Sequence, residues 1–276
     1  MGGLSFLLGL IIGSFTNAVV YRLPRGVSFT SGRSKCPHCS HVLSAWELIP
    51  LLSWLILGAK CRHCHERISV RYPLIELYVG ILFVLVYRTY AGGGLNIEGA
   101  IFSAFLIVLF LMLAVIDLER LLLPDSLLIT ILVGWVAYAL TRLSNNPYLS
   151  LQPVWSYGQS GYGGSLFAGF SIYNLACAAG LLFLLWGVWY LSKGRLFGLG
   201  DAKYIAVLTL IFGIRGSMIV FYGALVLGAL VSLLLLAIKR AGLKTKLPLG
   251  TFISIAATAY IFYGIIFVRH FYYLFV

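Results

Sequence analysis

Long apolar runs decide what this chain can fold into. Stretches of about 20 residues with almost no charged side chains recur from residue 3 to residue 268, and each is long enough to cross a bilayer as one helix. Only 10% of the residues are charged, whereas soluble domains carry about a quarter. The sequence therefore predicts an all-α polytopic membrane protein and excludes an ordinary soluble globule.

We expect about eight transmembrane helices, at residues 3–21, 73–91, 98–116, 126–142, 166–191, 201–214, 217–238 and 250–268. The opening run could be taken for a secretory signal, but it has no basic start and no small-residue cleavage site, so we interpret it as a retained span. The chain then divides into a first span (1–21), an inserted segment (22–72) and a transmembrane remainder (73–276).

The net charge of +12 would suit a nucleic acid or an anionic membrane surface. With the N-terminus outside, sixteen Lys and Arg residues fall on the inner side of the predicted spans and four on the outer side. This is the positive-inside bias, so topology explains the charge and we expect no nucleic-acid partner. Segment 22–72 would be cytoplasmic, and the polar, aromatic-rich loop 143–165 would lie outside.

Four of the five cysteines form two C-x-x-C pairs in segment 22–72, with 21 residues between the pairs: Cys36, Cys39, Cys61 and Cys64. Four thiolates fit one tetrahedral zinc ion, and a closed site of this kind is structural. Disulfides and redox-active pairs are the alternatives, and a reducing cytoplasm disfavours the first. Nearby histidines could substitute as ligands: His38, His41, His63 and His65. Cys177 lies in an apolar run and is expected to pack.

The chain contains three aspartates. Asp117 ends the third predicted span and Asp201 opens the sixth, so the topology places both at the cytoplasmic face. Carboxyl groups at this depth are costly and suggest a function. Two facing carboxyl groups share one proton, which suits peptide hydrolysis by an activated water.

Structural roles are also open for these aspartates. Asp201 could cap the sixth helix, and Asp125, after a proline, reads as the N-cap of the fourth. Asp117 could pair with Arg120 at the interface. The motif Gly198-Leu-Gly-Asp201 is by itself weak evidence for catalysis.

Eight short segments, in their order along the chain, resemble the type IV prepilin peptidase (leader peptidase/N-methyltransferase) family. They are Gly13-Ser-Phe-Thr-Asn17 through Pro24, the two cysteine pairs, Ile49-Pro-Leu-Leu-Ser-Trp54, Arg71-Tyr-Pro-Leu-Ile-Glu76, Asp117 through Asp125, Gly198 through Lys203, and Lys246-Leu-Pro-Leu-Gly-Thr-Phe252. Two departures are a longer connection between the aspartates and Thr16 in place of leucine.

The resemblance implies a membrane-embedded aspartic endopeptidase of the bacterial inner membrane, with Asp117 and Asp201 as the catalytic pair. It would remove the basic leader of prepilin or pseudopilin precursors after a glycine, at the cytoplasmic face. It would also N-methylate the new amino terminus with S-adenosylmethionine, although no residue can be assigned to that cofactor. A different Gly-x-Gly-Asp intramembrane protease, or a non-enzymatic scaffold or transporter with a zinc-stabilised domain, are the alternatives.

Overall fold

The computed structural model of this 276-residue chain describes residues 1–28, 32–91, 97–145, 167, 172–194, 198–239 and 247–275. Most of the loop predicted at 143–165 therefore lies outside the described residues, as does Lys246.

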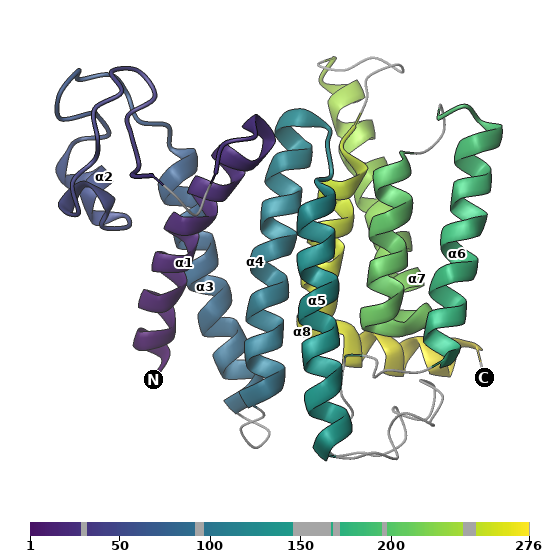
Figure 1. Cartoon of the computed structure of the whole chain (residues 1–276). Helices are drawn as coiled ribbons and strands as arrows, with labels where there is room; N and C mark the ends of the chain where they lie inside the picture. Colours follow the sequence, from purple (N-terminus) through teal and green to yellow (C-terminus); the bar gives the residue numbers. More distant parts are fainter. Residues whose placement is uncertain are drawn as a thin grey trace. The chain divides into compact units, whose positions relative to one another are not determined.

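The regular elements of the described residues are all helices, and their only strand-like pairings are two isolated bridges. The elements are α1 (Gly2–Arg22), η1 (Leu23–Arg25), η2 (Trp46–Leu48), α2 (Leu52–Ile56), α3 (Arg71–Ala91), α4 (Ile97–Arg120), α5 (Asp125–Asn145), α6 (Ile172–Leu191), α7 (Leu199–Ala237) and α8 (Leu249–Phe275). Figure 1 draws these helices along the chain. Within this described part, six helices are long and apolar enough to cross a membrane. The all-α membrane fold is thus confirmed.

Eight spans were expected, and helix α7 accounts for two of them. Its backbone leaves the helical region at Gly213, with φ 71° and ψ 173°, a conformation that glycine tolerates. The hydroxyl of Thr209 donates a hydrogen bond to Oγ of Ser217 at 3.0 Å. In a continuous helix, two residues eight positions apart would be separated by about 12 Å along the axis, too far for this bond. Helix α7 is therefore a helical hairpin, and its arms correspond to the predicted sixth and seventh spans. The apolar part of α8, Leu249–Gly264, is a shorter helix.

The chain forms two compact units, residues 1–108 and 109–276. In the first unit, α1 packs along α3 through small residues. A Cβ added to Gly9 would lie 2.7 Å from Cα of Gly80, and one added to Gly13 would lie 2.7 Å from Cα of Glu76. Close backbone approach at glycines is how membrane helices gain packing contacts in an apolar solvent.

In the second unit, α7 packs against α5, α6 and α8. Aromatic rings fill this core: Phe212 lies 4.9 Å from Tyr260 and 6.4 Å from Phe110, measured between ring centroids. The buried hydroxyl of Tyr204 hydrogen-bonds to that of Ser254 at 3.0 Å, which ties the first arm of α7 to α8. These contacts hold the start of α7 and the start of α8 close to the end of α4.

Candidate active site

Asp117 lies in the last turn of α4 and is buried, with 5% of its surface exposed. The helix ends at Arg120 because Leu121 adopts a left-handed conformation, with φ 53°. The backbone N–H of Leu121 donates to the carbonyl of Asp117 at 2.8 Å, which is a common way to close a helix C-terminus. The chain after Asp117 therefore turns sharply instead of continuing the helix.

Helix α8 supplies the hydrogen bonds of the Asp117 carboxylate. The backbone N–H of Thr251 donates to Oδ2 of Asp117 at 2.8 Å. The Thr251 hydroxyl lies 2.9 Å from the carbonyl of Ala114 and 3.3 Å from Oδ2 of Asp117, so its one proton can go to either. These bonds fix the orientation of a carboxyl group that sequence reasoning had allowed to pair with Arg120.

Asp201 lies in the first turn of α7. The N-cap of that helix is Gly198, so the alternative role of Asp201 as the N-cap is wrong. The carboxyl group instead bends back over Gly198, where an added Cβ would lie 2.8 Å from Oδ2 of Asp201. A side chain at position 198 would displace this carboxyl group.

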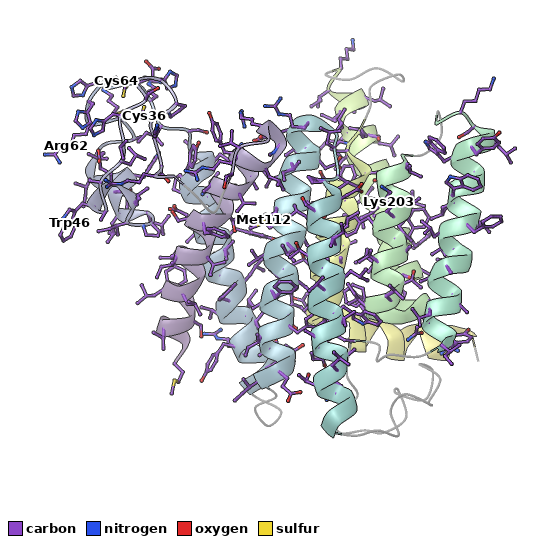
Figure 2. The ribbon with its side chains drawn as sticks, viewed as in Figure 1. Cys36, Trp46, Arg62, Cys64, Met112 and Lys203 are labelled. Atoms are coloured by element: carbon purple, nitrogen blue, oxygen red, sulfur yellow. The ribbon has the colours of Figure 1, made fainter. Side chains whose placement is uncertain are left out.

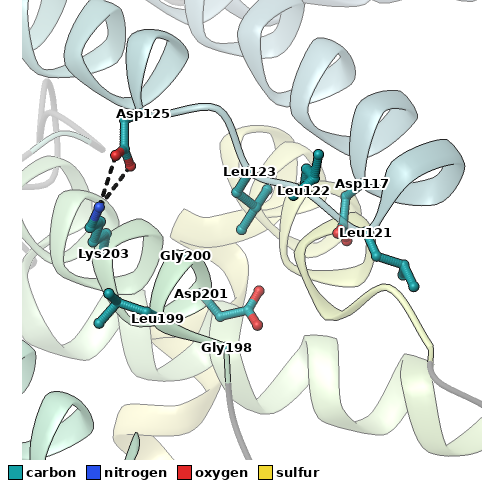
Figure 3. Close-up of a pocket in the computed structure, with 10 residues that line it drawn as sticks. All are labelled: Asp117, Leu121, Leu122, Leu123, Asp125, Gly198, Leu199, Gly200, Asp201 and Lys203. Atoms are coloured by element: carbon teal, nitrogen blue, oxygen red, sulfur yellow. Dashed lines mark hydrogen bonds and ion pairs between the residues drawn. The ribbon is translucent and has the colours of Figure 1, made fainter. Parts of the chain in front are cut away.

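One cavity of about 360 Å³ brings the two carboxyl groups together (Figure 3). Its lining is Asp117, Leu121, Leu122, Leu123, Asp125, Gly198, Leu199, Gly200, Asp201 and Lys203. Both Asp117 and Asp201 belong to this lining. Tertiary packing has thus placed two carboxyl groups, 84 residues apart in sequence, at one opening.

The sequence suggested that Asp125 caps the helix that follows it, but in the structure its carboxylate binds a lysine of α7. It is the first residue of α5, and both of its carboxylate oxygens lie 2.9 Å from Nζ of Lys203. The dashed lines in Figure 3 mark this ion pair, which joins the first residue of α5 to the second turn of α7 at the cavity wall. The carboxylate therefore binds another element, although its position at the start of a helix agrees with the sequence.

Two kinds of site residue were missed by sequence reasoning. Thr251 belongs to a segment that was noted without a role, and only the fold brings it to Asp117. Leu121 and Leu122 are about half exposed, at 49% and 57%, and give the cavity an apolar edge. Their position four and five residues after Asp117, at the end of a predicted span, was the only sequence signal available.

The four cysteines also come together. Their sulfur atoms all lie within 4.8 Å of one another, and Sγ of Cys36 is 3.9 Å from Sγ of Cys64. A tetrahedral zinc ion with bonds of about 2.3 Å separates its sulfur ligands by about 3.8 Å. Backbone N–H groups of Cys64 and His63 lower the pKa of the Cys61 thiol to about 7. The cluster fits a metal ion.

Each cysteine pair lies in a small hairpin of its own, and the two hairpins have the same backbone hydrogen bond. In the first, the N–H of Cys36 donates to the carbonyl of His41, and in the second the N–H of Cys61 donates to that of Glu66. The sequence Lys-Cys-x-His-Cys at 35–39 and 60–64 is the signal for this repetition. The rings of His41 and His63 lie against each other across the two hairpins, with centroids 3.4 Å apart and planes tilted by 33°. Four thiols therefore form the cluster, and two of the histidines pack against each other.

The fold and the site together define a class: a polytopic membrane protein with two aspartates in one cavity and a four-cysteine segment between its first two long helices. Residues 7–90 match the bacterial peptidase A24 N-terminal domain, and residues 104–233 match the type IV leader peptidase family.

Relatives of known name match most of the chain. The prepilin leader peptidase/N-methyltransferase of Aeromonas hydrophila is 31% identical over 289 residues, covering 95% of this chain and 90% of that protein. That of Burkholderia pseudomallei strain K96243 is 32% identical over 292 residues, covering 94% and 84%. That of Myxococcus xanthus strain DK1622 is 35% identical over 245 residues, covering 87% of this chain and 65% of that protein. No solved structure gives a match. The chain belongs to the type IV leader peptidase family.

Proposed function

We propose that this protein is an aspartic endopeptidase that removes the leader from prepilin or pseudopilin precursors, with Asp117 and Asp201 as its catalytic pair. One observation carries the proposal: the two aspartates, from the end of α4 and the start of α7, line the same cavity. Membership of the leader peptidase family supplies the substrate class.

The chemistry follows from two carboxyl groups that share one proton. The ionised aspartate removes a proton from a water molecule, whose oxygen attacks the carbonyl carbon of the scissile bond. The protonated aspartate donates its proton to the carbonyl oxygen. Transfer of a proton to the amide nitrogen then lets the C–N bond break, and the products are a carboxylic acid and an amine. The Thr251 N–H holds Asp117 in place throughout.

The cavity lining suits a peptide that enters beside a hydrophobic helix. Gly198 and Gly200 present no side chains, so a substrate backbone can approach Asp201 closely. Leu121 and Leu122 provide apolar contacts for residues that follow the cleaved bond. A glycine before the scissile bond would add no side chain beside the Asp201 carboxyl group, which already lies against Gly198.

The test is cleavage of a purified prepilin by the reconstituted protein. Asp117→Asn and Asp201→Asn should each abolish cleavage while leaving the helical content unchanged, because a neutral amide can neither accept nor donate the required proton. Asp125→Asn is the matched control, since it lines the same cavity but is bound to Lys203, and it should retain cleavage. Cleavage by either of the first two variants would refute the assignment.

We further propose that the metal at the four cysteines is zinc and that its role is structural. Cys36, Cys39, Cys61 and Cys64 would complete a tetrahedral shell and leave no open position for catalysis. The segment that carries them has a polar, basic composition and little core of its own, so metal binding would provide much of its folding free energy.

A second proposed activity is N-methylation of the newly exposed amino terminus. The relatives' names carry this proposal, and S-adenosylmethionine is the methyl donor it implies. Mass spectrometry of the processed substrate, with and without S-adenosylmethionine, tests cleavage position and methylation in one measurement. Products of equal mass in the two reactions would exclude the second activity and leave the first intact.

We also propose that the protein resides in the bacterial inner membrane with its cavity at the cytoplasmic face. The excess of Lys and Arg on one side of the spans supports this orientation. Protease added to sealed right-side-out vesicles should leave the cysteine segment, residues 22–72, intact, and the same protease should cut it in inverted vesicles. The opposite pattern would overturn the orientation.

A further inference from the structure

An exposed apolar face lies on the cysteine segment, outside the long helices. Leu52, Leu55 and Ile56 occupy positions i, i+3 and i+4 of α2, which is the spacing of one helix face. Their exposed fractions are 56%, 64% and 81%. Trp46, in the preceding turn η2, is 79% exposed. We call these four residues the α2 face.

The depth of this face is fixed by a buried carboxylate. The backbone N–H of Leu51, directly before α2, donates to Oε2 of Glu76 at 2.8 Å. Glu76 is buried and belongs to α3, a helix long and apolar enough to span a membrane. It lies five residues after Arg71, the first residue of α3, so it stands about 7.5 Å along the helix axis from that end. Helix α2 is therefore held level with the second turn of a membrane span.

Further contacts make this position firm. Leu51 is held at φ 59°, an unfavourable conformation for a residue with a side chain, which persists only where its surroundings impose it. The indole N–H of Trp54 donates to the carbonyl of Ile68 at 3.2 Å, just before α3. Trp54 thus faces inward, whereas the α2 face points outward. Figure 2 shows Trp46 at the edge of the segment away from Cys64.

The charge of the segment indicates what covers the face. Residues 22–72 contain eight Lys and Arg residues and two Glu residues. Basic side chains around exposed apolar and tryptophan side chains match the headgroup region of an anionic membrane, where tryptophan is enriched. Both ends of the segment continue into spanning helices, α1 and α3, so the bilayer surface is always within its reach.

We propose that the α2 face is a membrane-interface anchor: it inserts into the lipid headgroup and upper acyl region and seats the four-cysteine hairpins on the bilayer. If the cysteine segment were held away from the bilayer, this apolar surface would be exposed to water. Proteins rarely leave such a surface exposed unless it binds something. Burial of tryptophan and aliphatic side chains in the interface removes that surface from water, and the Leu51–Glu76 hydrogen bond sets how deep it goes. This role is independent of the proposed peptidase chemistry.

The experiment uses the full-length protein in liposomes that contain anionic phospholipid. Comparing wild type with Trp46→Phe isolates the emission of Trp46. Phospholipids that carry bromine high on the acyl chain should quench this emission strongly, and aqueous iodide should quench it weakly. The matched control is Glu66→Trp in the Trp46→Phe background, because Glu66 is exposed in the second cysteine hairpin. That tryptophan should show the opposite pattern.

Two outcomes overturn the proposal. Equal iodide quenching of Trp46 and of the Glu66→Trp reporter would mean that the face is in water. Protection from iodide without quenching by brominated lipid would mean that a protein covers it, either a second copy or a substrate helix. Replacing Leu55 and Ile56 together by Gln should reduce the lipid quenching of Trp46. Arg62→Gln, which removes charge but no apolar surface, should leave most of it.

Discussion

The backbone N–H of Thr251 lies 2.8 Å from Oδ2 of Asp117 and donates a hydrogen bond to it, across 134 residues of sequence. The bond joins the first turn of α8 to the last turn of α4. A carboxylate that is both buried and held by a backbone donor is preorganised, because the main chain cannot rotate away as a flexible side chain can. Helix α8 is thus part of the proposed active site although it contributes no carboxyl group.

The Thr251 hydroxyl should be a positioning group for Asp117. Thr251→Val keeps the shape and the backbone bond but removes the hydroxyl contacts to Ala114 and Asp117. We expect kcat for prepilin cleavage to fall roughly five- to tenfold with KM unchanged, which corresponds to about 1 kcal/mol of hydrogen bonding. Thr251→Ser should restore kcat. A purely structural role would instead lower the yield of folded protein and spare kcat.

Gly250 should tolerate no side chain. An added Cβ would lie 2.8 Å from Cδ2 of Leu123 and 3.0 Å from Oδ2 of Asp117, so Gly250→Ala should displace one or both. We expect cleavage to be nearly lost. Gly223→Ala is the matched control in the same unit, because its Cβ would meet only Cβ of Ala256 at an ordinary 3.6 Å. Comparable activity in the two variants would show that Leu123 moves aside at no cost to Asp117.

The Lys203–Asp125 ion pair should contribute little to stability. Both side chains are largely exposed, at 41% and 60%, and exposed pairs of this kind contribute between about 0 and 1 kcal/mol. A double-mutant cycle with Lys203→Met and Asp125→Asn, measured by thermal unfolding in detergent, should give a coupling energy in that range that shrinks with added salt. A coupling energy several times larger would show that the pair is less hydrated than its exposure indicates.

The cysteine cluster should be needed for folding of its segment. Cys36→Ser, or removal of metal by a chelator, should make residues 22–72 sensitive to protease, because the segment then loses the metal that ties its two hairpins together. Cys177→Ser is the control, since Cys177 lies in α6, outside the cluster. Bound zinc is measured directly by elemental analysis. Unchanged protease resistance of the metal-free segment would exclude a structural metal.

Cleavage should have a bell-shaped pH dependence. Two carboxyl groups in one cavity are active when they hold one proton between them. At low pH both take up a proton and no base remains, and at high pH both are ionised and no acid remains. The measurement is kcat/KM across the acid and neutral range, with helical content recorded at each pH. A constant value over that range would argue against a shared proton.

How much of this the sequence could predict depends on the range of the interaction involved. The spans followed from apolar runs because a bilayer demands one satisfied helix per run, whatever the neighbours do. The cysteine cluster followed from its spacing, since each hairpin is local. Asp117 and Asp201 could be assigned to one membrane face by counting charges, and the family resemblance gave their expected role.

Only the tertiary structure decided the contacts between distant residues. The turn at Gly213 folds one long helical element into two arms, which brings α7 against α8. Thr251 reaches Asp117, and Lys203 takes Asp125 as its partner, because separate helices pack side by side. The position of α2 beside the start of α3 likewise depends on hydrogen bonds from Leu51 to Glu76 and from Trp54 to Ile68. Apolar patterning fixes which segments are helices in the membrane, but it carries no information on which polar groups meet, and that depends on packing.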